Sequence, residues 1–532
     1  MRVSQRVYIY DTTLRDGAQT QGVDFGVADK LALAQALDRA GFDYVEGGWP
    51  GANPTDDAFF KAPPAFRRAK LAAFGMTRRA GRSAANDPGL AAVLESGAPA
   101  ICLVGKSWDF QVDVALGVGR DENVVMIRES VAHAVSRARE VLFDAEHFFD
   151  GYKANPDYAL QCIGAAAEAG ARWIVLCDTN GGSLPDEVER IVGAVARRIP
   201  DERLGIHCHN DTENAVANSL AAVRAGARQV QGTVNGLGER CGNANLISII
   251  PTLVLKMGFE TGLGREGLAQ LTHLSRAVDE RLNRAPLRNA AYVGESAFAH
   301  KGGLHVSAVA RDPRAYEHVP PETVGNRRNV VVSDQAGRAN ILARFDEIGL
   351  AVGADDPKVV RLIDVVKQRE FDGYSYDGAD ASFELLARRT LETVPEYFRL
   401  ESFRVIDERR WNAKGEVVTL SEATIKVDVG GERLMTVAEG NGPVNALDNA
   451  LRKALAAHFP ELASVRLVDY KVRILTPDAG TRAVTRVMIE SADADGARWA
   501  TVGVSANVID ASYLALHDAL TYKLFRARAR AA

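Results

Sequence analysis

The sequence lacks several features that mark whole classes of protein. Of its 532 residues only five are cysteine, an odd number without C-x-x-C spacing. This usage argues against a disulfide framework and for a reducing compartment. No apolar run approaches the roughly 20 residues that span a bilayer, and the opening stretch, MRVSQRVYIYDTT, contains no apolar signal region. We therefore expect a cytoplasmic protein without a membrane partner.

An excess of positive charge is also lacking. Lysine and arginine number 64, aspartate and glutamate 69, and the formal net charge is −5. No basic surface therefore argues for nucleic acid as a partner. The hydrophobic content of 47% and the charged content of 25% are ordinary for a globular protein. The chain is long enough for several domains, each with its own core.

The first half of the chain repeats one pattern, a short apolar run followed by a helical stretch. Eight such units fit into about 250 residues, which predicts a TIM barrel. A doubly wound open sheet is the competing fold, but it needs no eighth unit. The weakest helix prediction lies around residues 56–60. The eight predicted strands are Val7–Tyr10, Tyr44–Glu46, Leu71–Phe74, Ile101–Val104, Val141–Phe143, Trp173–Cys177, Leu204–His207 and Val230–Val234.

Polar residues gather where these predicted strands end. In a TIM barrel the active site lies at the carboxyl ends of the strands, so these side chains are expected to share one rim. They are Arg15 and Asp16 after the first strand, Glu46 at the second, Glu146 at the fifth, Thr179 after the sixth, His207 and His209 at the seventh, and Asn243 after the eighth.

The stretch HCHND, residues 207–211, suggests a metal site. Residues i and i+2 of a strand point to the same face, so His207 and His209 project together and Cys208 points away. With the Asp16 carboxylate and an asparagine oxygen, they form a mixed N/O set suited to Mg²⁺, Mn²⁺ or Zn²⁺. The alternative is a pair of hydrogen-bonded strand histidines. Cys208 and Cys241 are weaker ligand candidates.

Three motifs together resemble a known family. DTTLRDG, HCHND and GLGERCGNANL are similar to the signatures of the Claisen-condensing acyl-CoA enzymes, the 2-isopropylmalate, homocitrate and citramalate synthases. Hydroxymethylglutaryl-CoA lyase and some carboxyltransferases share that barrel. The resemblance covers about residues 5 to 530 and implies acetyl-CoA as co-substrate. It implies that Arg15 holds the keto-acid oxygen, that Thr179 contacts the keto-acid carboxylate, and that the metal is surrounded by Asp16, His207, His209 and Asn243.

The second half of the chain favours the synthases over the lyases. FAHKGGLHVSAV and YEHVPPETVGNRR resemble the synthases' linker subdomain, in which a histidine and a tyrosine reach over the barrel mouth. Here these are His305 and Tyr316, although Val-Ser follows His305 where the isopropylmalate pattern has Gln-Asp. We interpret His300 and His318 as solvated loop histidines. Residues 265–395 are expected to form mostly helical linker subdomains after a barrel of residues 1–264.

Residues 396–532 form long alternating strands and contain an internal repeat at an offset of 65. Thr436-Val437 matches Thr501-Val502, and Ala450-Leu451 matches Ala515-Leu516. We predict a duplicated α+β domain that makes the chain a homodimer. The resemblance implies that this domain also binds the pathway's end product, here isoleucine, and inhibits the enzyme. A plain dimerisation module is the alternative.

The reaction implied by the resemblance is a condensation of acetyl-CoA with a keto acid. The metal and Arg15 would stabilise the developing alkoxide, and His305, oriented by Glu146, would remove the methyl proton. Glu46 lies either near the metal or inward as a structural carboxylate. A lyase, or a non-catalytic amino-acid-binding regulator, is the alternative class.

The keto acid is expected to be pyruvate. GGWPGANPTD and GYSYDGADASFELL resemble the citramalate branch of the family, which uses pyruvate. Leu103 and Phe143 are predicted as apolar pocket walls, with Asp144 and Lys106 beside them. The alternatives are 2-ketoisovalerate, for leucine biosynthesis, and 2-oxoglutarate, as in homocitrate synthase.

Overall fold

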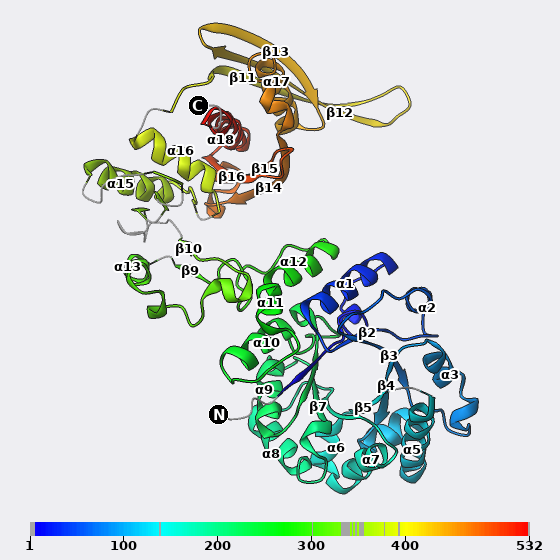
Figure 1. The fold of residues 1–532 in the computed structure, drawn as a ribbon. Helices are drawn as coiled ribbons and strands as arrows, with labels where there is room; N and C mark the ends of the chain where they lie inside the picture. The colour runs from blue at the N-terminus through cyan, green and yellow to red at the C-terminus, as the bar shows by residue number, and fades with distance from the viewer. Residues whose placement is uncertain are drawn as a thin grey trace. The chain divides into compact units, whose positions relative to one another are not determined.

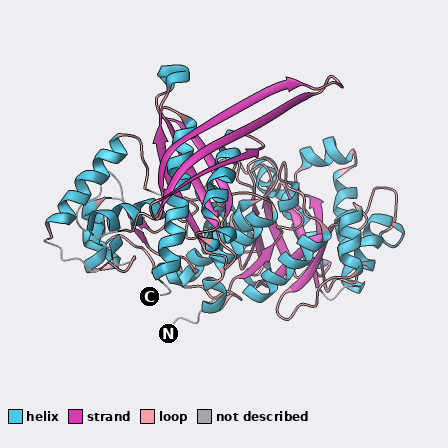
Figure 2. Ribbon diagram, turned by 90° about the horizontal axis from the view of Figure 1, so that it is seen from above, coloured by secondary structure: helices cyan, strands magenta, loops and turns pink. Residues whose placement is uncertain are grey.

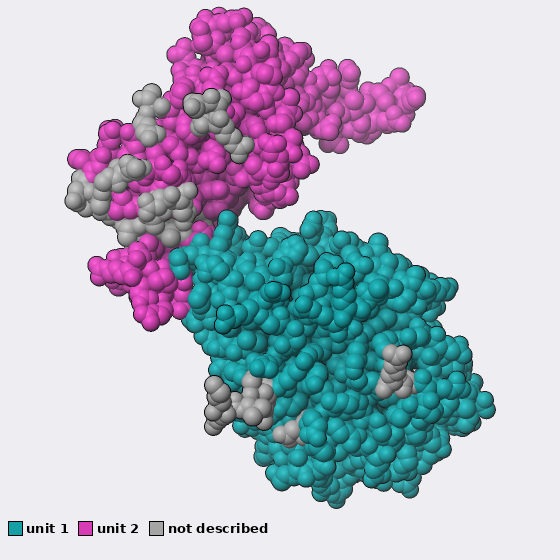
Figure 3. All heavy atoms as spheres, viewed as in Figure 1, with its two compact units in different colours: residues 1–298, 318–328 teal, residues 299–317, 329–532 magenta. Residues whose placement is uncertain are grey.

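The computed structural model describes residues 6–137, 140–300, 302–330, 341–342, 344–345, 348–350, 356–376, 378–391 and 394–529. The chain forms two compact units, residues 1–298 with 318–328 and residues 299–317 with 329–532 (Figure 3). The segment 265–395 is thus shared between the two units, and its limits stay a prediction. Within the described ranges no helix is long and apolar enough to cross a membrane.

The first unit is a closed barrel of eight parallel strands in sequence order (Figure 1). Strand β1 pairs with both β2 and β8, and the pairing of Tyr8 with Gln229 and of Asp11 with Gly232 closes the ring. The predicted TIM barrel is confirmed. The strands are β1 (Tyr8–Asp11), β2 (Tyr44–Gly48), β3 (Lys70–Met76), β4 (Ala100–Lys106), β5 (Glu140–Glu146), β6 (Trp173–Asp178), β7 (Leu204–Cys208) and β8 (Gln229–Gly232).

Helices follow the strands and cover the outside of the barrel. The weakest helix prediction is present as α2, where the Asn53 side chain accepts a hydrogen bond from Asp56 N at 2.9 Å and Pro54 occupies the first turn. The helices of this unit are α1 (Val27–Ala40), α2 (Pro54–Lys61), α3 (Pro88–Glu95), α4 (Asp109–Gln111), α5 (Arg120–Arg137), α6 (Phe148–Ala154), α7 (Pro156–Glu168), α8 (Pro185–Val195), α9 (Ala215–Ala225), α10 (Leu246–Leu255), α11 (Gly264–Ala269) and α12 (Leu271–Arg281).

Two separate cores lie on the two faces of the barrel strands. Residues such as Ile101, Leu103 and Phe143 pack outward against the helices. Cys102 and Trp173 belong to a smaller cluster inside the barrel. Alternate residues of a strand point to opposite faces, and a parallel sheet buries both. Apolar residues therefore occupy both parities, and on β4 and β5 the charged residues Lys106, Asp144 and Glu146 mark the parity that points inward.

The second unit joins a helical part to a duplicated α+β domain. The helical part contains β9 (Ala299–His300), α13 (Gly303–Arg311), β10 (Asn329–Val330), α15 (Pro357–Phe371) and α16 (Asp380–Leu391). The first repeat is β11 (Arg399–Trp411), β12 (Val417–Val429), β13 (Glu432–Gly440) and α17 (Pro443–Leu455); the second is β14 (Arg466–Ile474), β15 (Thr485–Ala492), β16 (Arg498–Ser505) and α18 (Val508–Ala529).

One hydrogen bond occurs at the same place in both repeats. Thr436 Oγ1 donates to Ala450 O at 2.7 Å, and Thr501 Oγ1 donates to Ala515 O at 2.8 Å. Each bond ties the last strand of a three-stranded sheet to the helix that follows it. The predicted duplication is confirmed. The repeats differ in β11 and β12, whose hairpin continues beyond the last pair with β13 and projects from its sheet (Figure 2).

Candidate active site

A cavity of about 260 Å³ opens at the carboxyl ends of the barrel strands. This is the rim on which the sequence places the polar groups. The lining residues come from the ends of most of the strands and from the loops after β1 and β8. They are Arg15, Asp16, Gln19, Trp49, Phe74, Met76, Val104, Lys106, Asp144, Glu146, Cys177, Thr179, His207, His209, Glu239 and Arg240.

Asp16, His207 and His209 meet in this cavity. Each offers one ligand atom, these atoms all lie within 4.8 Å of one another, and the three residues are buried. Asp16 Oδ2 lies 3.7 Å from His207 Nε2. Cys208 packs on the other side of β7 among the helix-facing residues, and Cys241 is exposed. The i, i+2 spacing thus brings two imidazoles to a carboxylate, and neither cysteine joins them.

Two buried polar atoms in this region lack a hydrogen-bond partner among the described residues, namely His209 Nδ1 and Asn243 Oδ1. Asn243 Nδ2 donates to Asp16 Oδ1 at 2.9 Å and to Leu237 O at 3.1 Å, so only the amide oxygen of Asn243 lacks a hydrogen-bond partner among the described residues. A buried polar atom without a partner is costly. The cluster of one carboxylate and two imidazoles fits a divalent cation that accepts nitrogen and oxygen ligands, and the unpartnered atoms of His209 and Asn243 are of the same two kinds.

The charge states of these groups also suit a cation. Burial alone would raise the pKa of Asp16, but Arg15, His207 and His209 outweigh it and lower this pKa to about 2. Burial, followed by the repulsion of His207, lowers the pKa of His209 to about 4. Near neutral pH Asp16 is therefore an anion and His209 is neutral, which are the forms that coordinate metals.

Arg15 lies beside this cluster and is held from three sides. Its Nε donates to Glu46 Oε2 at 2.7 Å, its Nη1 donates to Asp16 Oδ2 at 3.0 Å, and its guanidinium stacks 3.9 Å from the centre of the Phe74 ring. Glu46 is fully buried and also accepts hydrogen bonds from Tyr10 OH at 2.6 Å and from Thr12. Glu46 thus contacts Arg15 and lies outside the cluster of potential ligands.

The opposite wall of the cavity carries further charged and polar groups. Lys106 and Glu146 form an ion pair there. Thr179 Oγ1 accepts a hydrogen bond from His147 N at 2.8 Å. Asp144 is buried, and burial raises its pKa to about 6.

Two wall residues predicted from the sequence need correction. Leu103 and Phe143 do not line the cavity but lie in the core between the strands and the helices. Their neighbours in sequence, Val104 and Asp144, have the opposite parity and face the cavity. The apolar part of the wall consists instead of Trp49, Phe74, Met76 and Val104.

Sequence reasoning missed Gln231, a fully buried residue on β8. Its Oε1 lies 2.8 Å from His207 Nδ1, and its Nε2 donates to Asp144 Oδ1 at 2.9 Å. The available signal was a long polar side chain on an otherwise buried strand, since such a residue needs partners inside the barrel.

His305 and Tyr316 belong to the second unit, where their rings stack with centroids 4.2 Å apart. The structure brings these two together, and their approach to the barrel mouth stays a prediction. His300 is not a solvated loop residue: it is buried, and its Nε2 lies 3.2 Å from Glu317 Oε1. His318 is exposed and lies against Tyr292, with ring centroids 5.2 Å apart.

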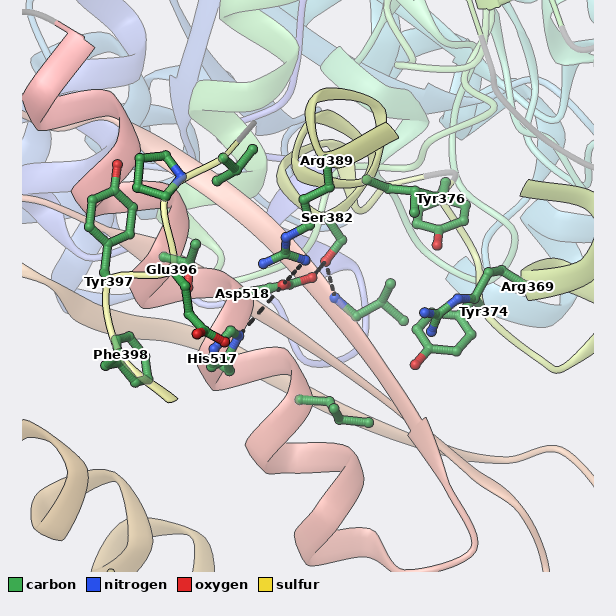
Figure 4. Close-up of a pocket in the computed structure, with 16 residues that line it drawn as sticks. Arg369, Tyr374, Tyr376, Ser382, Arg389, Glu396, Tyr397, Phe398, His517 and Asp518 are labelled. Atoms are coloured by element: carbon green, nitrogen blue, oxygen red, sulfur yellow. Dashed lines mark hydrogen bonds and ion pairs between the residues drawn. The ribbon is translucent and has the colours of Figure 1, made fainter. Parts of the chain in front are cut away.

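The second unit has a larger cavity of about 450 Å³, lined by residues of α15, α16, α18 and the segment before β11 (Figure 4). At its centre Asp518 accepts hydrogen bonds from Ser382 Oγ at 2.9 Å and from Arg389 Nη1 at 3.1 Å. His517 Nδ1 lies 3.9 Å from the same carboxylate. Ser382 and Arg389 of α16 thus tie this helix to Asp518 of α18.

Three family models match the chain in succession. Residues 6–276 match the HMGL-like model, residues 292–370 the homocitrate synthase post-HMGL domain-like model, and residues 377–524 the LeuA allosteric (dimerisation) domain. The chain is 50% identical to the (R)-citramalate synthase of Aquifex aeolicus, over 98% of this chain and 99% of that protein.

Two further relatives show how sequence identity differs between a citramalate synthase and a 2-isopropylmalate synthase. Identity is 52% with the (R)-citramalate synthase of Geobacter sulfurreducens, over 98% of each chain. Identity is 32% with the 2-isopropylmalate synthase of Dictyoglomus turgidum, over 97% of this chain and 98% of that protein.

Proposed function

Because this chain belongs to the family of the (R)-citramalate synthases, condensing acyltransferases built on an HMGL-like TIM barrel, we propose that it condenses acetyl-CoA with pyruvate to give (R)-citramalate and CoA. The observation that carries the proposal is the barrel-mouth cluster, in which Arg15 lies beside Asp16, His207 and His209. A cationic guanidinium next to a divalent-cation site suits a substrate with adjacent ketone and carboxylate oxygens.

A divalent ion would be held by Asp16, His207, His209 and Asn243, and when bound it supplies positive charge to the keto-acid oxygens. Arg15 is oriented by Glu46, and it donates to the ketone oxygen as negative charge develops there. Thr179, at the opposite rim, contacts the substrate carboxylate. These residues bind and polarise the keto acid before the new bond forms.

The condensation needs a base to take one proton from the methyl group of acetyl-CoA. The methyl carbon then attacks the ketone carbon of pyruvate, and the ketone oxygen gains a proton to become a hydroxyl. Water cleaves the thioester, which releases CoA as a thiol and leaves a carboxylate. We assign the base to His305, whose ring stacks with that of Tyr316 within the second unit.

The cavity wall favours pyruvate over larger keto acids. Phe74, Met76 and Val104 provide an apolar surface for a methyl group. A second carboxylate, as in 2-oxoglutarate, would face Asp144, and Lys106 is already paired with Glu146. The higher identity to the citramalate synthases, 50–52% against 32% for a 2-isopropylmalate synthase, supports the same choice.

Initial rates of thiol release with pyruvate, 2-ketobutyrate, 2-ketoisovalerate and 2-oxoglutarate test this proposal. We expect pyruvate to have the highest kcat/KM, and 2-ketobutyrate to be about 10–200-fold weaker because one methylene in an apolar pocket is worth that much. A higher kcat/KM for 2-ketoisovalerate would identify a 2-isopropylmalate synthase. If no keto acid releases CoA but a hydroxyacyl-CoA is cleaved, the enzyme is a lyase.

We propose that the domain boundaries lie after residues 264 and 395. For the last domain, residues 396–532, we propose that it dimerises the chain and that isoleucine binds it as a regulator. The match of residues 377–524 to an allosteric dimerisation domain and the duplicated sheets support this role. Light scattering of the full chain measures its oligomeric state. Initial rates with isoleucine, leucine and valine measure the effector, and equal rates with and without each amino acid would contradict the regulatory role.

A further inference from the structure

A chain of hydrogen bonds crosses the interior of the barrel. Gln231 on β8 lies beside His207 on the neighbouring strand β7, to which it is paired in register. Its amide bridges His207 Nδ1, at 2.8 Å, and Asp144 Oδ1, at 2.9 Å. Asp144 lies on β5, which is not a neighbour of β8, so the second bond spans the barrel. All three side chains are buried.

We propose that Gln231, held by Asp144, is a positioning residue that fixes which ring nitrogen of His207 faces Asp16 and the cation. This inference rests on the metal assigned under the proposed function. A carboxylate accepts hydrogen bonds only, so Asp144 holds the amide NH₂ of Gln231. The amide oxygen then faces His207 and accepts the proton of Nδ1. The free lone pair of the imidazole is therefore on Nε2, 3.7 Å from Asp16 Oδ2.

A partner on the second ring nitrogen is how proteins set the tautomer and orientation of a metal-binding histidine. Usually a carboxylate or a backbone carbonyl has this role. Here the carboxylate acts through an amide, which keeps the negative charge of Asp144 one residue away from the imidazole. Asp144 also borders the substrate cavity, so the same chain connects a cavity wall to the cluster.

Gln229 provides a matched control on the same strand. It precedes Gln231 by two residues, so its side chain has the same parity, and it is also fully buried. Neither its Oε1 nor its Nε2 has a hydrogen-bond partner among the described residues. Any general effect of removing a buried amide from β8 is therefore expected in both positions, whereas an effect on His207 is expected only at Gln231.

The experiment is calorimetric titration of the purified full-length chain with Mn²⁺ at pH 7.5, where the Asp144 carboxyl is ionised. Gln231→Met removes both hydrogen bonds at nearly constant volume, and we expect the Kd for Mn²⁺ to rise about 10–100-fold. Gln229→Met is expected to leave the Kd within about twofold of that of the unchanged chain. Circular dichroism establishes that both variants fold.

A donor–acceptor exchange provides the second measurement. Gln231→Glu leaves an acceptor for His207 Nδ1 but no donor for Asp144, and two carboxylates then face each other. Adding Asp144→Asn restores one donor and one acceptor. We expect the double variant to bind Mn²⁺ more tightly than Gln231→Glu alone, and within about fivefold of the unchanged chain.

The inference is overturned if a folded Gln231→Met variant binds Mn²⁺ within twofold of the unchanged chain, or if Gln229→Met loses as much Mn²⁺ affinity as Gln231→Met. It is also overturned if adding Asp144→Asn to Gln231→Glu does not tighten Mn²⁺ binding. These outcomes leave the proposed function intact. If the unchanged chain binds no Mn²⁺ and releases CoA at full rate with a chelator present, the metal assignment fails together with this inference.

Discussion

The two cavities of this protein differ in how their buried polar groups are satisfied. At the barrel mouth, His209 Nδ1 and Asn243 Oδ1 have no hydrogen-bond partner among the described residues. In the cavity of the second unit, Asp518 accepts from Ser382 and Arg389 and lies beside His517. The barrel mouth thus contains polar atoms that are free to bind a ligand. The polar groups at the centre of the other cavity instead bond to one another and join α16 to α18.

This difference teaches which cavity to treat as a reactive site. Leaving a buried polar atom unsatisfied costs about 1–3 kcal/mol. At the barrel mouth the two unsatisfied atoms belong to residues that meet Asp16 in a cluster of potential metal ligands. Volume alone would favour the cavity of the second unit as the reactive site, since it measures about 450 Å³ against 260 Å³ at the barrel mouth. The clustering of unsatisfied atoms with other potential ligands is the better guide, because neither a volume nor a lone unsatisfied amide such as that of Gln229 specifies a ligand.

The largest effect is expected from removing a ligand at the barrel mouth. His207→Ala should lose the cation and at least about 10³-fold in kcat, because the charge that stabilises the developing alkoxide is lost. Metal analysis and thiol release measure both losses, and thermal unfolding is the control for folding. A chelator should abolish the activity of the unchanged chain, and Mg²⁺ or Mn²⁺ should restore it. Full activity in a metal-free sample would contradict the assignment.

A smaller loss is expected from Arg15→Lys. Arg15 meets Glu46 through Nε and Asp16 through Nη1, and a planar guanidinium still has further N–H groups to donate. An ammonium cannot reproduce this arrangement, so kcat/KM for pyruvate should fall about 10²–10³-fold while Mn²⁺ binding persists. Parallel kinetics and calorimetry separate the two properties. Equal loss of metal and activity would instead make Arg15 part of the metal site.

In the second unit the matched change should affect stability rather than catalysis. Asp518→Asn weakens the bonds to Arg389 and Ser382, and we expect a loss of about 1–3 kcal/mol in the unfolding of this unit. The value of kcat should stay within about twofold. Urea unfolding followed by circular dichroism measures the first quantity, and thiol release the second. A tenfold loss of kcat would show that this cavity takes part in the reaction.

The smallest effects are expected in the two repeats. Thr436→Val and Thr501→Val each remove one hydrogen bond to a helix carbonyl, at 2.7 Å and 2.8 Å. Each should cost about 0.5–1.5 kcal/mol. Thr501 is fully buried whereas Thr436 is partly exposed, so the second change should cost more. Urea midpoints of the two variants test this order, and the reverse order would show that burial of the threonine does not set the cost of losing its bond.

Much of the barrel could be predicted from the sequence alone. The eight apolar runs each overlap an observed strand, because a short buried run between turn residues has few other structures available. The spacing of His207 and His209 likewise determined that they share a face, since strand parity is local geometry. Asp16 could be added because every strand of a barrel ends at the same rim.

The parity of β4 and β5 was available in the sequence, because Lys106 and Glu146 share it with Val104 and Asp144. The prediction of Leu103 and Phe143 as cavity walls did not apply this parity, and both pack outward. Only the tertiary structure decided the role of Gln231. The role of Gln231 depends on Asp144 and His207, which are distant in sequence and meet only when the barrel closes. Local periodicity determines the elements, but contacts across a closed barrel depend on how all eight strands are tilted and registered together.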